Sequence, residues 1–321
     1  MEKTIDITAM GELLIDFAEY GTSEYGNRLL EVCPGGAPCN MLSMASRLGK
    51  KTAFIGKVGN DNFGRFLRKT IVSTGIDDTG LLTDDKAPTT LAFVHTLEGG
   101  EREFSFCRNG SADTMLKAEE LRTDLIKSSR VFHFGTLSMT DEPVLSATKK
   151  ALETAKEAGC IISFDPNLRP PLWKSLDDAR AAMEYGFERC DILKIADNEV
   201  EFITGTCDYD AGISRIIQKY DIPLVFLTMG KNGSRAYYKG LRIEADGFKV
   251  NSIEATGAGD CFCASAVCRV LDRGPDNLSA EMLKDILVFA NAAAAIVTTR
   301  KGAILSMPTE DEVLTLLEEN R

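Results

Sequence analysis

Hydrophobic positions along the chain form short apolar runs that alternate with segments in which they recur at helical spacing. The runs predict strands, listed as residues 4–14, 52–58, 131–134, 161–164, 192–195 and 224–228. The helical spacing predicts helices at 41–48, 63–74, 143–158, 177–189, 211–219, 280–297 and 309–319. This alternation predicts an α/β protein whose parallel sheet is covered on both faces. Ligands bind such sheets beyond the carboxyl ends of the strands.

Residues 89–107 follow a different pattern. Apolar and polar residues alternate on either side of Gly99-Gly100, which predicts a hairpin. Together with part of residues 12–33, this hairpin is expected to form a small sheet outside the main body. Two short strands at 234–238 and 242–245 complete the expected elements.

The stretch Gly257-Ala258-Gly259-Asp260 runs directly into a long apolar segment, which predicts a tight loop that opens into a buried helix. Backbone N–H groups at a helix start have no intrahelical partners, so they bind anions, assisted by the helix dipole. A carboxylate beside an anion site suits phosphoryl transfer to a hydroxyl group. The simpler interpretation is a structural turn in which Asp260 caps the helix.

Other nucleotide-binding motifs are missing from the sequence. There is no G-x-x-x-x-G-K-[ST] loop, and the H-R-D and D-F-G signatures of protein kinases do not occur. Phe262 stands where a dinucleotide fingerprint needs its third small residue.

The chain has 321 residues, enough for one large α/β domain or two domains. Its formal net charge of −11 argues against nucleic acid and anionic membranes as partners. No apolar stretch is long enough to span a bilayer, and the N-terminus does not resemble a signal peptide. Nine cysteines without a C-x-x-C pair, and only two histidines, predict core thiols in a reducing cytoplasm rather than a zinc site.

Two long segments resemble signatures of the ribokinase-like (phosphofructokinase-B type) carbohydrate kinases. The first runs from Gly35-Gly36-Ala37-Pro38-Cys39-Asn40 to Gly64, and the second is Thr256–Asp260. Residues 134–135, 165–173 and 289–292 look most like bacterial fructokinases. The resemblance implies one kinase domain over residues 1–321, with a three-layer α/β/α parallel sheet. It also implies a small β-sheet lid, formed by about residues 12–33 and 89–108.

The resemblance also implies a sugar site. Asp16 and Asn40 would bind sugar hydroxyls, since a carboxylate and an amide suit a polyol. Gly35 and Gly36 would let the backbone approach the sugar, and Asn167 would lie nearby. Arg108 would reach from the lid toward the substrate, with a surface salt bridge as the alternative. Arg169 would clamp a phosphate through its guanidinium group.

On the nucleotide side, the resemblance implies contacts from Thr228, Gly230 and Gly233, with Asn291 near the adenine. Asn198 and Glu201, spaced as N-x-x-E, would hold Mg²⁺ near the phosphates of ATP. The alternative is an N-cap Asn with a first-turn Glu. A K⁺ site is also implied, but Glu254 and Ala255 replace the usual Asp and Thr there.

The implied reaction is ATP-dependent phosphorylation of the C6 hydroxyl of fructose. Asp260 would accept the proton, and the N–H groups of Gly257, Ala258 and Gly259 would stabilise the phosphoryl charge. Rival acceptors are 2-keto-3-deoxygluconate, for which Arg108 would be the committed cation, ribose or a nucleoside. A non-catalytic sugar- or nucleotide-binding regulator is a distant alternative. A homodimer is expected, with Phe104 and Phe106 of the lid meeting a second subunit.

Overall fold

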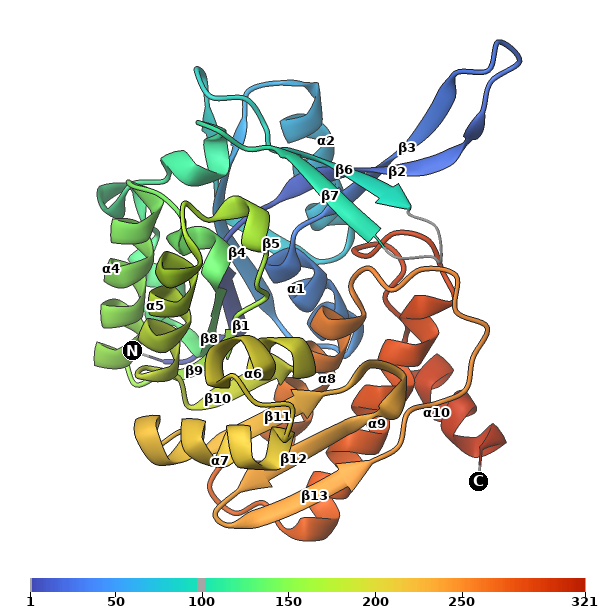
Figure 1. Cartoon of the computed structure of the whole chain (residues 1–321). Coiled ribbons are helices and arrows are strands. Elements are labelled where there is room, and N and C mark those ends of the chain that lie inside the picture. The colour runs from blue at the N-terminus through green and yellow to red at the C-terminus, as the bar shows by residue number, and fades with distance from the viewer. Residues whose placement is uncertain (1, 97–101, 321) are drawn as a thin grey trace.

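The computed structural model describes residues 2–96 and 102–320 (Figure 1). The predicted Gly99-Gly100 turn lies outside the described residues, as does the side chain of Phe104. Two sheets organise the described chain: a nine-stranded sheet in the body, and a four-stranded sheet that stands above it.

The body sheet confirms the predicted α/β architecture. In spatial order its strands are β13 (Leu241–Ala245), β12 (Ser234–Tyr238), β11 (Leu224–Thr228), β10 (Ile192–Ala196), β9 (Ile161–Asp165), β8 (Ser129–Gly135), β1 (Ile5–Met10), β4 (Thr52–Gly59) and β5 (Ile76–Asp84). The pairs from β11 to β5 are all parallel, and β12 and β13 add antiparallel strands at one edge. The carboxyl ends of the parallel strands therefore meet at one side of the sheet.

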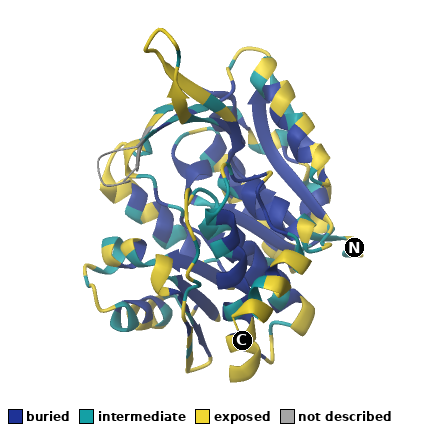
Figure 2. Ribbon diagram, turned by 90° about the vertical axis from the view of Figure 1, so that its right-hand side faces the viewer, coloured by how far each residue is buried: buried dark blue, intermediate teal, exposed yellow. Residues whose placement is uncertain are grey.

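Helices cover both faces of this sheet, so each face has its own apolar core. One face is covered by α1 (Ala37–Arg47), α2 (Asn62–Ser73), α8 (Ala258–Arg273) and α9 (Ala280–Thr298), with α10 (Glu310–Glu319) packed on α9. The other face is covered by α3 (Thr123–Lys127), α4 (Val144–Glu157), α5 (Leu176–Phe187), α6 (Asp197–Thr204) and α7 (Tyr209–Tyr220). Figure 2 shows buried residues along the sheet and on the inward helix faces, with exposed residues outside.

The second sheet contains both segments that were expected to form a lid. Its order is β3 (Arg28–Gly35), β2 (Leu14–Thr22), β6 (Leu91–Thr96) and β7 (Arg102–Cys107). Strand β2 pairs antiparallel with β3 and parallel with β6, so two hairpins join into one sheet. The β2–β3 hairpin projects away from the body, and most of its outer half is exposed (Figure 2).

Local sequence explains several element ends. The Asp61 side chain accepts the Gly64 N–H and so begins α2, and Thr309 forms a capping box with Glu312 at the start of α10. The prediction of a single strand over residues 4–14 is wrong, because β1 ends at Met10 and a second strand, β2, starts at Leu14. Gly11 lies between them at φ 155°. No helix of the described residues is long and apolar enough to cross a bilayer.

Candidate active site

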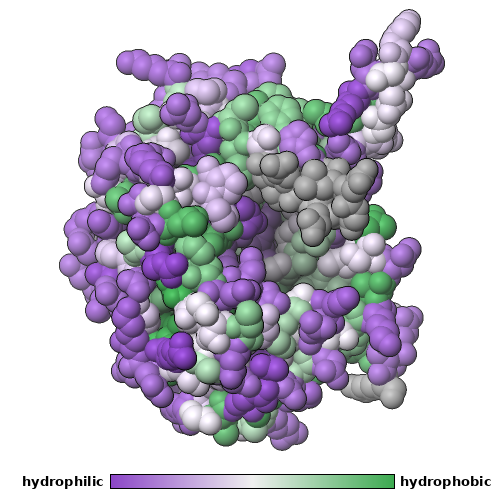
Figure 3. Space-filling view, in the orientation of Figure 1, coloured by the Kyte–Doolittle hydropathy of each residue, from purple (hydrophilic) through white to green (hydrophobic). Residues whose placement is uncertain are grey.

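A cavity of about 1110 Å³ opens at the carboxyl ends of the parallel strands, under the second sheet. Figure 3 shows the surface hollowed at this place. Most of the predicted site residues line it, namely Asp16, Gly36, Asn40, Asn167, Arg169, Asn198, Thr228, Gly230, Gly233, Gly257, Ala258, Gly259, Asp260 and Asn291. Gly35, Arg108 and Glu201 do not line it.

The helix start at α8 forms the floor of this cavity. Gly257 is its N-cap residue, without a side-chain cap, and Asp260 lies in its first turn. The Ala258 N–H donates to the Ala255 carbonyl at 3.2 Å, so this group is less available to an anion than the sequence suggested. Among the described residues, the N–H groups of Gly257 and Gly259 have no such partner and remain for an anion.

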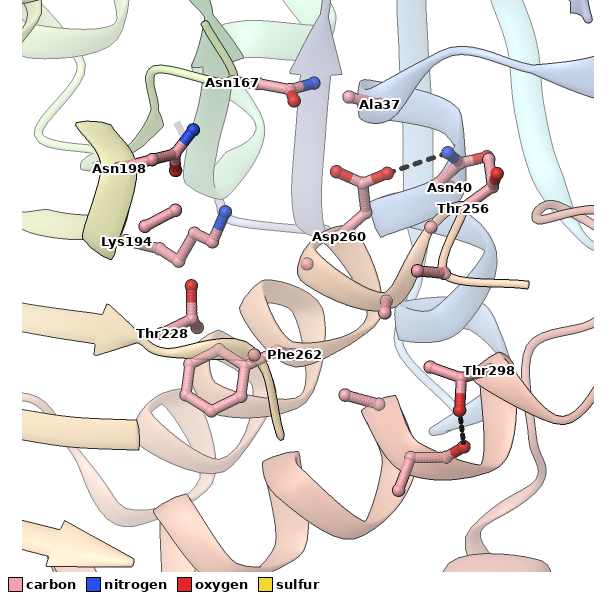
Figure 4. Close-up of a pocket in the computed structure, with 18 of the residues that line it drawn as sticks. Ala37, Asn40, Asn167, Lys194, Asn198, Thr228, Thr256, Asp260, Phe262 and Thr298 are labelled. Carbon is pink, nitrogen blue, oxygen red and sulfur yellow. Dashed lines mark hydrogen bonds between the residues drawn. The ribbon is translucent and has the colours of Figure 1, made fainter. Parts of the chain in front are cut away.

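Asp260 is held by a residue that is distant in the sequence. The Asn40 amide donates from Nδ2 to Asp260 Oδ2 at 2.8 Å (Figure 4). Burial raises the pKa of Asp260 to about 6, assisted by the charge of Asp165 and opposed by the Asn40 bond and by Lys194 and Arg169. Because this pKa still lies below 7, the carboxylate is mostly ionised at neutral pH and can accept a proton.

Asp16 faces the same part of the cavity from β2. Burial raises its pKa to about 7; the charge of Arg169 opposes this shift, and the charges of Glu254 and Asp260 add to it. Gly35 does not line the cavity but makes room for Asp16, because a Cβ on Gly35 would lie 2.2 Å from Asp16 Oδ2. Its absent side chain is what allows the carboxylate to lie there.

Arg108 lies at the end of β7, and its guanidinium group is buried rather than directed at the cavity. Its Nε donates to Asp113 Oδ2 at 2.8 Å, Nη1 to the Thr140 hydroxyl at 2.7 Å and Nη2 to the Leu137 carbonyl at 2.6 Å. The alternative of a surface salt bridge is also wrong, since both partners are buried. Arg108 joins the second hairpin to the body.

Two charged residues that line the cavity near the end of β10, Lys194 and Glu199, were not predicted from the sequence. Lys194 lies with Nζ 3.1 and 3.0 Å from the two carboxylate oxygens of Asp165. A Cβ on Gly259 would be 3.1 Å from this Nζ, so the ammonium lies beside the helix start (Figure 4). Burial lowers the pKa of Lys194, but the charges of Asp165 and Glu199 outweigh it and keep the pKa above its ordinary value.

The second missed residue is Glu199, on the helix that was expected to bind metal. Glu199 is buried and lines the cavity next to Asn198, and its carboxylate accepts the N–H groups of Leu168 and Ala196, both at 2.8 Å. Glu201 is exposed on the outside of α6, where the Cys207 thiol donates to it at 3.4 Å. Helix α6 turns Glu199 inward and Glu201 outward, which spacing alone did not distinguish.

Thr228, Gly230 and Gly233 follow β11 and border the part of the cavity that lies along α9. Asn291 of α9 is there too, but its amide is already engaged. Its Oδ1 accepts the Ser234 hydroxyl at 2.8 Å, and its Nδ2 donates to the carbonyls of Ala245 and Asp246 at 3.1 and 3.0 Å. Asn291 therefore fixes the segment after β13, which also lines the cavity.

An anion-binding helix start beside an ionised carboxylate, at the strand ends of a parallel sheet, defines a kinase that phosphorylates a hydroxyl group. The sequence profile described as pfkB family carbohydrate kinase matches residues 4–310, and the chain belongs to that family. The chain is 42% identical to "Probable fructokinase-2" of Arabidopsis thaliana, over 97% of this chain and 95% of that protein.

Solved structures agree with this assignment. The fructokinase of Xylella fastidiosa with bound ATP superposes with a TM-score of 0.88 at 30% identity, covering 100% of this chain and 99% of that one. A double mutant of the fructokinase of Vibrio cholerae O395, in a form with bound fructose, ADP and potassium ion, gives a TM-score of 0.87 at 30% identity. That comparison covers 99% of this chain and 100% of the other.

Proposed function

We propose that this carbohydrate kinase is a fructokinase that transfers the γ-phosphoryl group of ATP to the C6 hydroxyl of D-fructose. The observation that carries the proposal is the Asn40–Asp260 pair. Asn40 Oδ1 is buried and has no hydrogen-bond partner among the described residues, so it offers an acceptor to a sugar hydroxyl next to the base. Relatives with similar sequence and structure are fructokinases.

In the proposed reaction, Asp260 accepts the proton of the hydroxyl as its oxygen attacks the γ-phosphorus and the bond to ADP breaks. The N–H groups of Gly257 and Gly259 stabilise the charge on the phosphoryl oxygens, with a smaller contribution from Ala258. The ammonium of Lys194, beside Gly259, adds a positive charge at the same place. Closure of the second sheet over the sugar would exclude water as a competing acceptor.

The remaining predicted contacts are proposals of the same kind. Asp16, Asn167 and Arg169 would contact the sugar or the transferred phosphate, and Gly36 would let the backbone approach them. Thr228, Gly230 and Gly233 would border the nucleotide. Arg108 and Asn291 would act indirectly, since their polar groups already bond to protein.

Mg²⁺ is expected to accompany ATP. Mg²⁺ is usually bound by one or two protein oxygens together with phosphates and water. The Asn198 amide oxygen at the cavity wall fits this requirement, and each Glu199 carboxylate oxygen, which accepts one backbone N–H, keeps a second lone pair for the ion or its water. We propose these two residues in place of the Asn198–Glu201 pair. When bound, the ion would neutralise charge on the phosphates.

Three further features belong to the proposal. K⁺ is expected near residues 254–256, where the Glu254 carboxylate accepts the Gly302 N–H at 3.3 Å. A homodimer formed through the second sheet is still proposed, but through the exposed apolar side chains of the β2–β3 hairpin rather than through Phe106, which lines the cavity. The cytoplasm is proposed as the compartment because all nine cysteines are free thiols.

The alternative acceptor 2-keto-3-deoxygluconate is less well supported. The carboxylate of this acceptor would need a cationic side chain to bind it. The guanidinium of Arg108 is already hydrogen-bonded to Asp113, Thr140 and Leu137. Loss of the base would mark a non-catalytic regulator, and Asp260 is present.

A panel of acceptors tests the proposal. The purified enzyme would be assayed with ATP and each of four acceptors: fructose, ribose, adenosine and 2-keto-3-deoxygluconate. The rate of ADP formation would be followed with a coupled spectrophotometric assay. We expect the highest kcat/KM for fructose. NMR of the product should show the phosphate on the C6 oxygen. A higher kcat/KM for another acceptor would overturn the fructose assignment.

A further inference from the structure

Glu12 is a buried carboxyl group that the proposed reaction does not use. It lies between β1 and β2, where the chain leaves the body to form the first hairpin of the second sheet, and its side chain is 4% exposed. It lines the active-site cavity and has neither a lysine nor an arginine in ion-pair contact among the described residues. A buried carboxyl in this position needs a structural or functional reason.

The Glu12 side chain spans the base of this hairpin. Its Oε1 accepts the N–H of Ala37 at 2.9 Å. Ala37 is the first residue of α1, directly after the chain returns from β3 to the body. This hydrogen bond thus connects the entry and the exit of the hairpin just outside the β2–β3 ladder, which begins at the Leu14–Gly35 pair.

This bond also caps α1 from outside the helix. The N-cap residue Gly36 supplies no side-chain cap, and the first turn of α1 has no acidic residue. Gly36 cannot carry a side chain here, because its φ is 120° and a Cβ would lie 2.4 Å from the Glu12 carbonyl oxygen. The acceptor that the helix start requires comes instead from Glu12.

Helix α1 carries the residue that holds the base. Asn40 lies one turn after Gly36, whose carbonyl accepts the Asn40 N–H at 2.9 Å, and its amide donates to Asp260. A continuous chain of contacts therefore runs from Glu12 to Asp260. It passes through Ala37 and the first turn of α1 to Asn40. Figure 4 shows Ala37, Asn40 and Asp260 on neighbouring helix starts at the cavity.

The second hairpin is fixed in a related way, since Arg108 at its exit is buried against Asp113, Thr140 and the Leu137 carbonyl. Burial raises the pKa of Glu12 to about 7, while the Glu12 and Ala37 backbone bonds and the charge of Arg108 oppose the rise and Asp113 adds to it. An acceptor oxygen is present whether or not Glu12 carries a proton. A glutamine has the same length and would also supply one.

We propose that Glu12 is a positioning residue, which caps α1 and thereby sets Asn40 and Asp260 in register with the sugar hydroxyl. The inference rests on the proposed sugar kinase function. Its physical reason is that a displacement of about 1 Å in a reacting group can cost about 10²-fold in rate. The sugar side of the reaction should depend on Glu12 much more than ATP binding does.

The test compares Glu12→Ala, Glu12→Gln and Glu12→Asp with the parent and with a control, Glu119→Ala, which removes an exposed carboxylate in the 3₁₀ turn Ala118–Glu120. We expect Glu12→Ala to lower kcat/KM for the sugar about 10- to 100-fold, with KM for ATP changed less than about threefold. Glu12→Gln should stay within about threefold of the parent. Glu12→Asp keeps the charge but is one methylene too short, so it should resemble Glu12→Ala.

A folded Glu12→Ala enzyme with kcat/KM within about twofold of the parent would overturn the proposal, as would Glu12→Gln being as impaired as Glu12→Ala. A purely structural role would lower Tm and leave the kinetics of the folded enzyme unchanged, and this too would overturn it. If Glu12→Ala does not fold, the other two variants test the proposal. Glu12→Gln keeps the length of the side chain without its charge, and Glu12→Asp keeps the charge without the length. The sugar preference of the parent reports on the proposed function, whereas only the variant-to-parent ratios report on Glu12.

Discussion

Replacing Asp260 by asparagine tests its role as the base. The alternative that Asp260 caps α8 is wrong, because the N-cap residue is Gly257 and Asp260 lies in the first turn. Asp260→Asn keeps size and shape, its amide oxygen can still accept the Asn40 N–H, and no charge remains to be buried, so Tm should be maintained. As the base, however, Asp260 should contribute about 10²–10⁴-fold to kcat. We expect kcat to fall by that factor while the dissociation constants of sugar and ATP change little.

The measurements are kcat, the sugar dissociation constant and Tm of the purified variant. A kcat within tenfold of the parent would contradict the base assignment. The pH profile is an independent check, because the pKa of Asp260 is about 6 and the base must be ionised. The kcat/KM of the parent should rise as the pH increases through about 6, and this rise should vanish in Asp260→Asn.

Asp16 provides a prediction about stability. Its pKa is about 7 in the folded chain, above the ordinary value of about 4, so the folded state holds the proton more tightly than the unfolded state. The contribution of Asp16 to the free energy of unfolding should therefore be largest below about pH 4. This contribution should decrease as the pH rises from about 4 to about 7, and should stay low above about pH 7. Asp16→Asn removes this penalty.

We expect Asp16→Asn to have a higher Tm than the parent at pH 8, by roughly 2–5 °C, with a smaller difference at pH 5 and with weakened sugar binding. Asp276→Asn, which changes an exposed carboxylate, is the control and should shift Tm equally little at both pH values. An Asp16→Asn enzyme that is less stable at pH 8 than at pH 5, relative to the parent, would contradict the argument.

At the residue level, the predictable side chains were those whose position is determined by neighbouring residues in the sequence. Asp260 and Asn40 sit at helix starts within long motifs, so their place at the strand ends was predictable. Lys194 and Glu199 were not found, because a lysine in an apolar strand and a glutamate in a short helix give no signal of which way they point. The burial of Arg108 depends on Asp113 and Thr140, which a single sequence does not connect to it.

At the element level, the second sheet is expected to close when sugar binds. Its two hairpins contribute Asp16 and Phe106 to the cavity wall but belong to a sheet separate from the body. Sugar would join the two sheets through hydrogen bonds, so amide hydrogen exchange in residues 14–35 and 91–107 should slow when fructose is added. Helix α7 does not line the cavity and serves as the internal control. Unchanged exchange in both hairpins would contradict closure.

Most strands and helices of the body were predictable because their apolar residues recur at a clear period. Strand β5 was not predicted, since Ile76–Asp84 carries several aspartates and lies at the edge of the sheet, where only part of each side is buried. Helix α6 was not among the predicted helices, because its eight residues are too few to show a period. A helix start with Asn198 as N-cap was considered as an alternative, but the N-cap residue is Ala196. The joining of the two hairpins through β2 and β6 is a long-range pairing, which local patterns do not encode.

At the scale of the whole molecule, the outer part of the β2–β3 hairpin exposes more large apolar side chains than a free surface element needs. These are Tyr20, Tyr25, Leu29, Leu30 and Val32, each at least 41% exposed. Exposed apolar residues concentrated on one hairpin are typical of interaction sites, and we expect a second copy of the chain to cover them.

Sedimentation at micromolar concentration should therefore give twice the mass of one chain, and Leu30→Glu should shift the equilibrium toward the monomer. Leu176→Glu is the matched control, because Leu176 is 54% exposed on α5, far from the hairpin in sequence and in the body layer. A monomeric parent, or equal effects of the two substitutions, would contradict a dimer through this hairpin.

The burial of the thiols has a practical consequence for chemical labelling. Seven of the nine cysteines are buried, while Cys107 ends β7 and Cys207 follows α6 at the surface. The Cys207 thiol donates to Glu201, which raises its pKa and reduces the thiolate that reacts with maleimides. A limiting amount of a maleimide fluorophore should therefore collect on Cys107, so that the natural chain carries its own attachment point for a reporter of sugar binding.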